Sequence, residues 1–288
     1  MGLLGNLKSL FGSKTNIATR FELLREAITG TMSTFYMARD RQTGQVVGLK
    51  ILDLEKHIAY ENRFKGLKKP GEGEIGMAIH HPNIMKTLEF GTSTDGLQFI
   101  VVEFIQGPGL HSVLVSKDRR LDGRRVKLLR QAAEALKAVH DTGYIHHDVC
   151  PRNFVCSQDL ETIKLIDFGL TIPATPEFMQ PGNRTGTANY MAPEVVRRRA
   201  KDWRIDVFSF GAMAYEMLTF KLPWERGHGQ AALQHDPTID VLALRPQTNR
   251  RLAEVIERCL APDPDQRVYS FDQFLLMTAK LKTEDDPS

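Results

Sequence analysis

The sequence predicts an α+β protein of two lobes, because two kinds of apolar pattern follow one another along its 288 residues. From Phe21 to Val102, short apolar runs are broken by turn residues, which is typical of strands. After Gly107 the apolar residues recur at helical spacing. A boundary between two such lobes is a favoured place for a ligand cleft.

The strand-like part contains a predicted hairpin turn at Gln42-Thr43-Gly44-Gln45. One helix is expected to interrupt the strands. It should start near Pro70, since proline suits a first helical turn, and end before Pro82. An interior glycine costs about 1 kcal/mol relative to alanine, and this helix has three glycines in a short stretch: Gly71, Gly73 and Gly76. The helix is therefore expected to form late or to swing, unless the glycines merely weaken it.

The helical part contains an amphipathic segment whose apolar residues share one face: Val126, Leu128, Leu129, Ala132, Ala133, Leu136 and Val139. Phe208–Leu218 and Arg251–Leu260 also predict helices.

Composition excludes several classes of protein. Hydrophobic residues make up 42% and charged residues 25% of the chain, which is ordinary for a soluble domain. The net charge of +3 comes without a dense basic block, so no nucleic-acid partner is expected. Three cysteines do not make an even disulfide framework, which favours a reducing, cytoplasmic environment. Phe99–Val102 is too short to span a bilayer, and no N-terminal secretory signal is recognisable.

The N-terminal tail, residues 1–17, has apolar residues at helical spacing: Leu3, Leu4, Leu7, Leu10 and Phe11. Two interpretations remain open. The segment is either a short amphipathic membrane anchor or a frayed tail or helix packed on the first lobe, and we favour the second.

Three polar residues in the helical part indicate phosphate chemistry. Asp148 is followed five residues later by Asn153, and Asp167 comes after an apolar run and before a glycine. Carboxylate and amide oxygens suit magnesium, so Asn153 and Asp167 are candidate metal ligands. Asp148 can accept a proton from an attacking hydroxyl.

These segments resemble the catalytic and magnesium loops of eukaryotic-like, bacterial-type serine/threonine protein kinases. The resemblance covers residues 21–281 and includes Ala192-Pro193-Glu194, which looks like the end of an activation segment. Asp206 looks like the aspartate that holds the catalytic loop, and Arg267 looks like the partner of Glu194. The resemblance implies a bilobal kinase fold with ATP and Mg²⁺ between the lobes.

In the first lobe the resemblance assigns Lys50 to the phosphates of ATP. Its implied partner is a glutamate nine residues before His81, which is Glu72, with Glu74 as the alternative. The glycine-rich loop is eroded, since its three glycine positions hold Ile28, Gly30 and Ser33. Val102 resembles the gatekeeper, and Glu103 to Ile105 the hinge. The implied nucleotide-binding residues are Ile28, Gly30, Phe35, Gly48, Lys50, Val102, Glu103, Ile105, Val155 and Ile166.

The catalytic loop departs from the family at two positions. His147 replaces an arginine that reads a phosphate on the activation loop, so activity is not expected to depend on such a phosphate. Cys150 replaces a phosphate-contacting lysine, and Arg152 is expected to supply the missing charge. Thr187, in a Gly-Thr-x-x-Tyr segment typical of Ser/Thr kinases, is expected to hydrogen-bond Asp148.

The predicted function is ATP-dependent phosphorylation of Ser/Thr hydroxyls in proteins. The alternatives are a pseudokinase that acts as a nucleotide-binding or scaffolding module, which the eroded loop and Cys150 suggest, and a small-molecule kinase, which the complete activation segment opposes. We expect the N-lobe at residues 18–105, the C-lobe at 106–281 and a disordered acidic tail at 282–288. The oligomeric state stays open.

Overall fold

The computed structural model describes residues 14–25, 28–30, 32–64, 66–224 and 238–285. It divides into two compact units. The first, here the N-lobe, holds the described residues up to Ala78 together with Lys86–Phe104. The second, the C-lobe, holds Ile79–Met85 and the described residues from Ile105 onward. Of the predicted N-terminal tail, residues 1–17, the part that carries its apolar positions, residues 1–13, lies outside the described residues.

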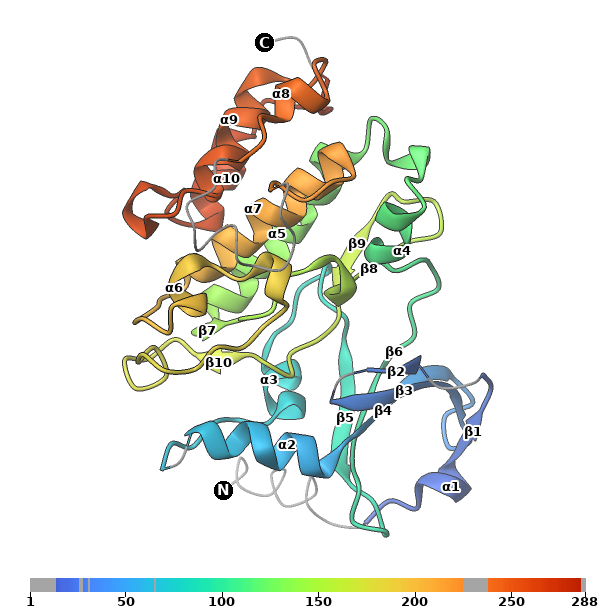
Figure 1. Cartoon of the computed structure of the whole chain (residues 1–288). Helices are drawn as coiled ribbons and strands as arrows, with labels where there is room; N and C mark the ends of the chain where they lie inside the picture. Colours follow the sequence, from blue (N-terminus) through green and yellow to red (C-terminus); the bar gives the residue numbers. More distant parts are fainter. Residues whose placement is uncertain (1–13, 26–27, 31, 65, 225–237, 286–288) are drawn as a thin grey trace, which may run out of the picture. The chain divides into compact units, whose positions relative to one another are not determined.

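The N-lobe is built on an antiparallel sheet (Figure 1). Its strands follow the order β1-β3-β4-β6-β5, and β2 pairs with β3 at the side of this path. Their bounds are β1 Phe21–Leu23, β2 Ile28–Thr29, β3 Ser33–Asp40, β4 Val46–Leu52, β5 Thr87–Thr92 and β6 Gln98–Glu103. The predicted hairpin turn joins β3 to β4, where Gly44 has a φ of 74°.

The two faces of this sheet differ in character because side chains alternate along each strand. One face packs into an apolar cluster with the short helix α1, Ile17–Arg20. The buried members of this cluster are Phe21, Ala38, Val47, Leu49, Phe99 and Val101, with Tyr36 and Ile51 partly buried against them. The strand registers place Phe35 opposite Lys50, and Gly48 opposite Val102. These four residues therefore share the other face, which we call the lysine face.

Two helices interrupt the strands in the described part of the N-lobe, and only one of them was predicted. The expected helix is α3, Glu72–Ala78. The expectation of a single helix is wrong, because α2, Leu54–Glu61, follows β4 directly. Asp53 caps α2 by accepting the Lys56 N–H at 3.2 Å, and α2 buries only His57 and Tyr60. So few buried positions give no apolar stripe that a sequence pattern could reveal.

The C-lobe is mainly helical, and the three predicted helices are confirmed, two of them with longer bounds and α9 shifted by one residue. They are α5 Arg125–Asp141, α7 Arg204–Thr219 and α9 Arg250–Cys259. The helix α7 is buried along almost its whole length and packs against both α5 and α9 (Figure 1). The helix α10, Phe271–Met277, packs on α5, and its rings Phe271 and Phe274 meet Phe210 of α7 edge to face. Shorter helices are α4 Leu110–Val115, α6 Pro193–Val196 and α8 Val241–Leu244.

Two small antiparallel sheets hold the polar loops of the C-lobe. The strand β7, Tyr144–Ile145, pairs with β10, Ile172–Pro173. The strand β8, Phe154–Cys156, pairs with β9, Ile163–Leu165. Asp148 and Asn153 lie between β7 and β8, and Asp167 follows β9. The two pairs therefore fix both ends of the segment that carries the predicted catalytic residues.

The acidic tail differs from its prediction. Glu284 is fully buried and its carboxylate contacts Arg125 Nη1 at 2.6 Å, so the expectation of disorder is wrong for Glu284 and Asp285. No helix in the described part of the chain combines the length and apolarity that a membrane crossing needs.

Candidate active site

The lysine face carries a buried ion pair. Lys50 Nζ of β4 is in direct contact with Glu72 Oε1, at the first residue of α3. Of the two candidate partners, the structure therefore places Glu72 on Lys50. The other, Glu74, accepts the N–H of Gly71 at 2.9 Å and so caps the start of α3. The pair holds the Lys50 ammonium in a defined place on this face.

In the C-lobe, Asp206 of α7 holds the loop that precedes Asp148. Its carboxylate accepts the backbone N–H of His146 at 2.7 Å and that of His147 at 2.8 Å, and it contacts His140 Nε2 at 2.9 Å. Burial by itself raises the pKa of Asp206, but the hydrogen bond and charge of His140 and the N–H of His147 outweigh it and hold the pKa below its ordinary value. Asp206 is therefore a buried, charged carboxylate that holds the loop before Asp148 in place.

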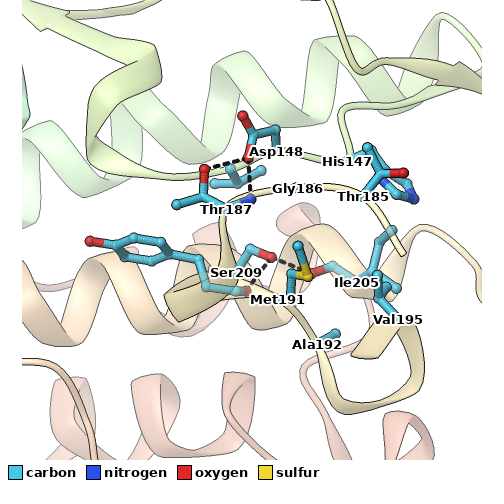
Figure 2. A pocket seen from close by; sticks show the side chains of 12 residues that line it. His147, Asp148, Thr185, Gly186, Thr187, Met191, Ala192, Val195, Ile205 and Ser209 are labelled. Atoms are coloured by element: carbon cyan, nitrogen blue, oxygen red, sulfur yellow. Dashed lines mark hydrogen bonds between the residues drawn. The ribbon is translucent and has the colours of Figure 1, made fainter. Parts of the chain in front are cut away.

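Both carboxylate oxygens of Asp148 are held by hydrogen bonds, of which Figure 2 shows those from Thr187. Oδ1 accepts the Thr187 hydroxyl at 2.8 Å and the Thr187 N–H at 2.7 Å. Oδ2 accepts Asn153 Nδ2 at 2.9 Å. The expected contact of Thr187 with Asp148 is thus present. A carboxylate fixed in this way keeps further lone pairs with which to accept a proton.

The donor chemistry of Asn153 and Asp167 fits a magnesium ion. Asn153 Nδ2 donates to the Asp148 carbonyl at 2.7 Å as well as to its carboxylate, which directs the amide nitrogen to Asp148 and leaves the amide oxygen for a cation. The Asn153 carbonyl accepts the N–H of Ile166, the residue before Asp167, at 3.0 Å. Asp167 is oriented by its Oδ1, which accepts the Gly169 N–H at 2.7 Å, and by its carbonyl, which contacts His146 Nε2 at 2.7 Å. His146 was not among the predicted site residues, although its place two residues before Asp148 was a usable signal.

Cys150 and Arg152, which is expected to supply the charge that Cys150 lacks, have different surroundings. Cys150 is buried, with its Sγ 3.5 Å from the Thr187 hydroxyl. Burial, and then the charge of Asp148, raise the pKa of its thiol to about 12, so it is neutral at pH 7. Arg152 has an exposed side chain and makes no ion pair within the described residues. The structure therefore shows no ion pair between the side chains of Arg152 and Asp148.

The end of the activation segment is fixed to the C-lobe by a buried ion pair. Arg267 donates from both terminal nitrogens to Glu194, at 2.7 and 2.8 Å, and its guanidinium lies 4.9 Å from the centre of the Phe208 ring. The predicted pairing of Arg267 with Glu194 is present.

The predicted nucleotide-binding residues fall into both lobes. Phe35, Gly48, Lys50 and Val102 share the lysine face. Ile28 lies in β2, Gly30 donates its N–H to the Ser33 carbonyl at 2.8 Å, and Glu103 ends β6, where its carboxylate accepts the N–H of Lys86 at 2.8 Å. The C-lobe holds Ile105, Val155 of β8 and Ile166.

Comparison with known proteins agrees with this geometry. A family model described as a protein kinase domain matches residues 21–277. This chain belongs to the protein kinase family. The kinase domain is 34% identical to the serine/threonine-protein kinase pkn2 of Myxococcus xanthus over 214 residues, which are 72% of this chain and 25% of that protein. It is 29% identical to the serine/threonine-protein kinase PknB of Mycobacterium tuberculosis over 265 residues, or 88% of this chain and 41% of that protein.

An aurora kinase of Yarrowia lipolytica is 28% identical over 266 residues, 91% of this chain and 68% of that protein. The kinase domain spans less than half the length of the two bacterial relatives named above. The predicted resemblance to bacterial-type Ser/Thr kinases is confirmed.

Proposed function

We propose that this chain is an ATP-dependent protein kinase that phosphorylates Ser/Thr hydroxyls of protein substrates. The observation that carries the proposal is the Asp148 carboxylate, fixed by Thr187 and by Asn153, which is itself a candidate metal ligand. The Ser/Thr relatives and the bond from Thr187 to Asp148 support serine and threonine as acceptors. Because its three cysteines are free and buried, we place the kinase in the cytoplasm.

The chemical step needs one proton acceptor and charge stabilisation at the phosphates. As the substrate oxygen bonds to the γ-phosphorus, the bond from this phosphorus to the bridging oxygen of ADP breaks, and the hydroxyl proton passes to Asp148. Lys50, held by Glu72, stabilises the negative phosphate oxygens. Magnesium, when bound with ATP, neutralises phosphate charge, and Asn153 and Asp167 are the residues that would hold it.

The proposal is tested by incubating the purified chain with magnesium-ATP and a mixture of generic protein substrates, and mapping the new phosphosites by mass spectrometry. Asp148→Asn keeps the shape of the side chain but removes the proton acceptor, so transfer should fall at least a hundredfold. Lys50→Met and Asp167→Asn should abolish transfer with the fold intact. Asp141→Asn, at an exposed aspartate at the end of α5, is the matched control and should keep full turnover. Nucleotide binding without any transfer by the unmodified chain would instead favour the pseudokinase.

A further inference from the structure

A groove in the C-lobe lies between α6 and the loop that follows α9. Its volume is about 550 Å³, which falls within the range of about 300–1,000 Å³ that ligand pockets occupy. Pro193 and Arg197 line it on the side of α6, and Pro262 and Pro264 line it on the side of the loop. A proline has a fixed backbone angle and almost no rotamer freedom to lose, so these walls change little when a ligand binds.

One guanidinium holds the two walls of this groove together. Arg267 donates from both terminal nitrogens to Glu194 of α6, at 2.7 and 2.8 Å. The same side chain donates to the Ala261 carbonyl at 2.7 Å and to the Pro262 carbonyl at 3.1 Å, both in the loop. Arg267 is buried, which protects these bonds from water. The groove is therefore preformed, and Arg267 already neutralises the charge of Glu194.

Positive charge gathers on the α6 side of the groove. Three arginines follow α6 in sequence, Arg197, Arg198 and Arg199, and the first and last of them line the groove. The side chain of Arg199 is exposed and makes no ion pair within the part of the chain that the structure describes. A guanidinium offers a planar pair of donors that matches a carboxylate, so this surface suits an acidic ligand.

The arginine run continues through a position where glycine is usual. The helix α6 ends in the two bonds of a Schellman motif, from the Arg198 N–H to the Val195 carbonyl at 3.1 Å and from the Arg199 N–H to the Glu194 carbonyl at 2.8 Å. Arg198 therefore has a φ of 55°, a left-handed conformation that glycine adopts freely and that costs an arginine energy. Such a cost is typical of a functional surface.

We propose that this groove binds an acidic segment, rich in aspartate and glutamate, of a protein partner. The two arginines in its lining, Arg197 and Arg199, can each meet a carboxylate of an extended segment. Glu284 and Asp285 of this chain already pair with other arginines of the C-lobe, so the segment belongs to another molecule. The inference goes beyond phosphoryl transfer, because binding in the groove requires no nucleotide.

The test is the binding of a fluorescein-labelled peptide of alternating glutamate and alanine to the purified full chain, measured by anisotropy without nucleotide. A peptide with glutamine in place of every glutamate should not bind. Arg199→Gln should weaken binding of the glutamate peptide about threefold, the effect of one exposed ion pair. The double variant Arg197→Gln/Arg199→Gln should weaken it about tenfold.

Arg250→Gln is the matched control for the loss of one positive charge. Arg250 is exposed and begins α9, whereas the groove lies beyond the last residue of that helix. This variant should bind the glutamate peptide as the unmodified chain does. Thermal melting of all the arginine variants checks that each of them folds.

Asp263→Asn tests the groove in the opposite direction. Asp263 lines the groove, and its Oδ1 accepts the Asp265 N–H at 3.0 Å, which caps a short 3₁₀ helix. Asparagine caps a helix as well as aspartate does, so the variant keeps the loop and removes only a negative charge. Binding of the glutamate peptide should therefore become about threefold tighter.

No binding of the glutamate peptide would overturn the inference, and so would equal binding of the glutamine peptide. An equal loss in Arg199→Gln and Arg250→Gln would also overturn it, because the net charge of the chain would then decide the affinity. A phosphoserine peptide that binds where the glutamate peptide does not would show a site for phosphate instead. Each of these results leaves the proposed phosphoryl transfer untouched, since that activity is measured separately.

Discussion

His147 is a buried histidine without a partner for its ring. Both ring nitrogens lack a hydrogen-bond partner among the described residues, and the backbone is left-handed, with a φ of 70°. Burial, and then the charge of Lys201, lower the pKa of His147 from its ordinary 6.5 to about 4, although Asp206 opposes the shift. The ring is therefore neutral at pH 7, as expected from the sequence. A neutral ring in this position cannot replace an arginine that binds phosphate.

This buried ring predicts a pH dependence of stability. The unfolded chain binds a proton at His147 near pH 6.5 and the folded chain only near pH 4, so stability is complete above pH 6.5 and falls as the pH drops toward 4. The loss attributable to His147 is on the order of 3 kcal/mol. His147→Asn, a residue that tolerates left-handed backbone, should flatten this part of the profile. Urea unfolding at a series of pH values between 7 and 4.5 measures the free energy of unfolding of the unmodified chain and of His147→Asn. Parallel profiles for these two proteins would contradict the assignment of the pH dependence to His147.

A second prediction at the residue scale concerns the charge that Cys150 does not supply. Arg152→Ala should lower kcat at least tenfold, since charge stabilisation dominates phosphoryl transfer, and Cys150→Lys should partly restore it. Arg119→Ala is the matched control, because this arginine is highly exposed and pairs with Asp122 on the surface. Steady-state kinetics measures kcat for the unmodified chain and for each of these variants. Full turnover in Arg152→Ala would mean that its exposed side chain has no part in the reaction.

At the scale of the element, the glycines of α3 have a packing role that helix propensity does not show. A methyl group on Gly73 would lie 2.5 Å from Cβ and Cγ of Phe90 in β5, and one on Gly76 would lie 2.3 Å from the Thr87 hydroxyl. The two glycines let the helix lie close against the sheet, so that Glu72 contacts Lys50. The hypothesis that they make α3 swing stays untested.

Gly73→Ala should therefore destabilise the N-lobe, even though alanine favours a helix by about 1 kcal/mol. The overlap with Phe90 involves atoms next to the backbone, which cannot move away, and overpacking of this kind costs about 1–3 kcal/mol. Gly71→Ala is the control, since its methyl group would meet only Glu74 Oε2 at 3.9 Å. Thermal melting measures the stability of Gly73→Ala and Gly71→Ala relative to the unmodified chain. A more stable Gly73→Ala protein would show that propensity outweighs packing.

The activation segment gives a further prediction at this scale. Thr171 is buried and donates its hydroxyl to the His146 carbonyl at 3.3 Å, and Thr185 is buried beside His147 (Figure 2). Because His147 takes the place of the arginine that would bind a phosphate, phosphatase treatment should change turnover less than tenfold. A larger loss, above about 1.4 kcal/mol in the barrier, would refute this, and Thr185→Ala would then show whether that threonine is responsible.

For the whole molecule, the buried tail connects distant parts of the C-lobe. Glu284 Oε1 accepts from Arg125 at 2.6 Å and from the Gly123 N–H at 2.8 Å, near the start of α5. The Glu284 carbonyl accepts the N–H of Asn249, which caps α9, at 2.7 Å. Glu284, whose carboxylate is buried from solvent, thus connects the start of α5 with the start of α9.

Removing the charge of Glu284 should leave the buried Arg125 without its buried counter-ion, with only the exposed Asp122 carboxylate still paired to it at 2.8 Å. Glu284→Gln is expected to lower the free energy of unfolding by about 3–5 kcal/mol, the usual effect of breaking a buried pair. Asp285→Asn, at a more exposed carboxylate that pairs with Arg245, should cost about 1 kcal/mol or less. Urea unfolding of the full chain measures both. Equal, small effects would show that the tail is not a structural part of the lobe.

The sequence by itself determined the elements and residues whose signal is local. A long helix such as α5 buries one face of a regular repeat, so its apolar stripe is visible in the sequence. Asp148, Asn153 and Asp167 are identified by type and spacing, because a short loop fixes how far apart such side chains can lie. The pairing of Arg267 with Glu194 was implied by the resemblance to the kinase family, and the structure contains it.

Only the tertiary structure decided the features that depend on what lies opposite a residue. The helix α2 buries too little to show a stripe, and the choice of Glu72 over Glu74 depends on where α3 begins against β4. The acidic tail looked disordered because a charge is normally solvated, but in the folded lobe Arg125, Arg245 and the Gly123 N–H surround the buried Glu284 carboxylate. Likewise, Gly48 and Phe35 are thirteen positions apart in the sequence, and only the strand register shows that one makes room for the other.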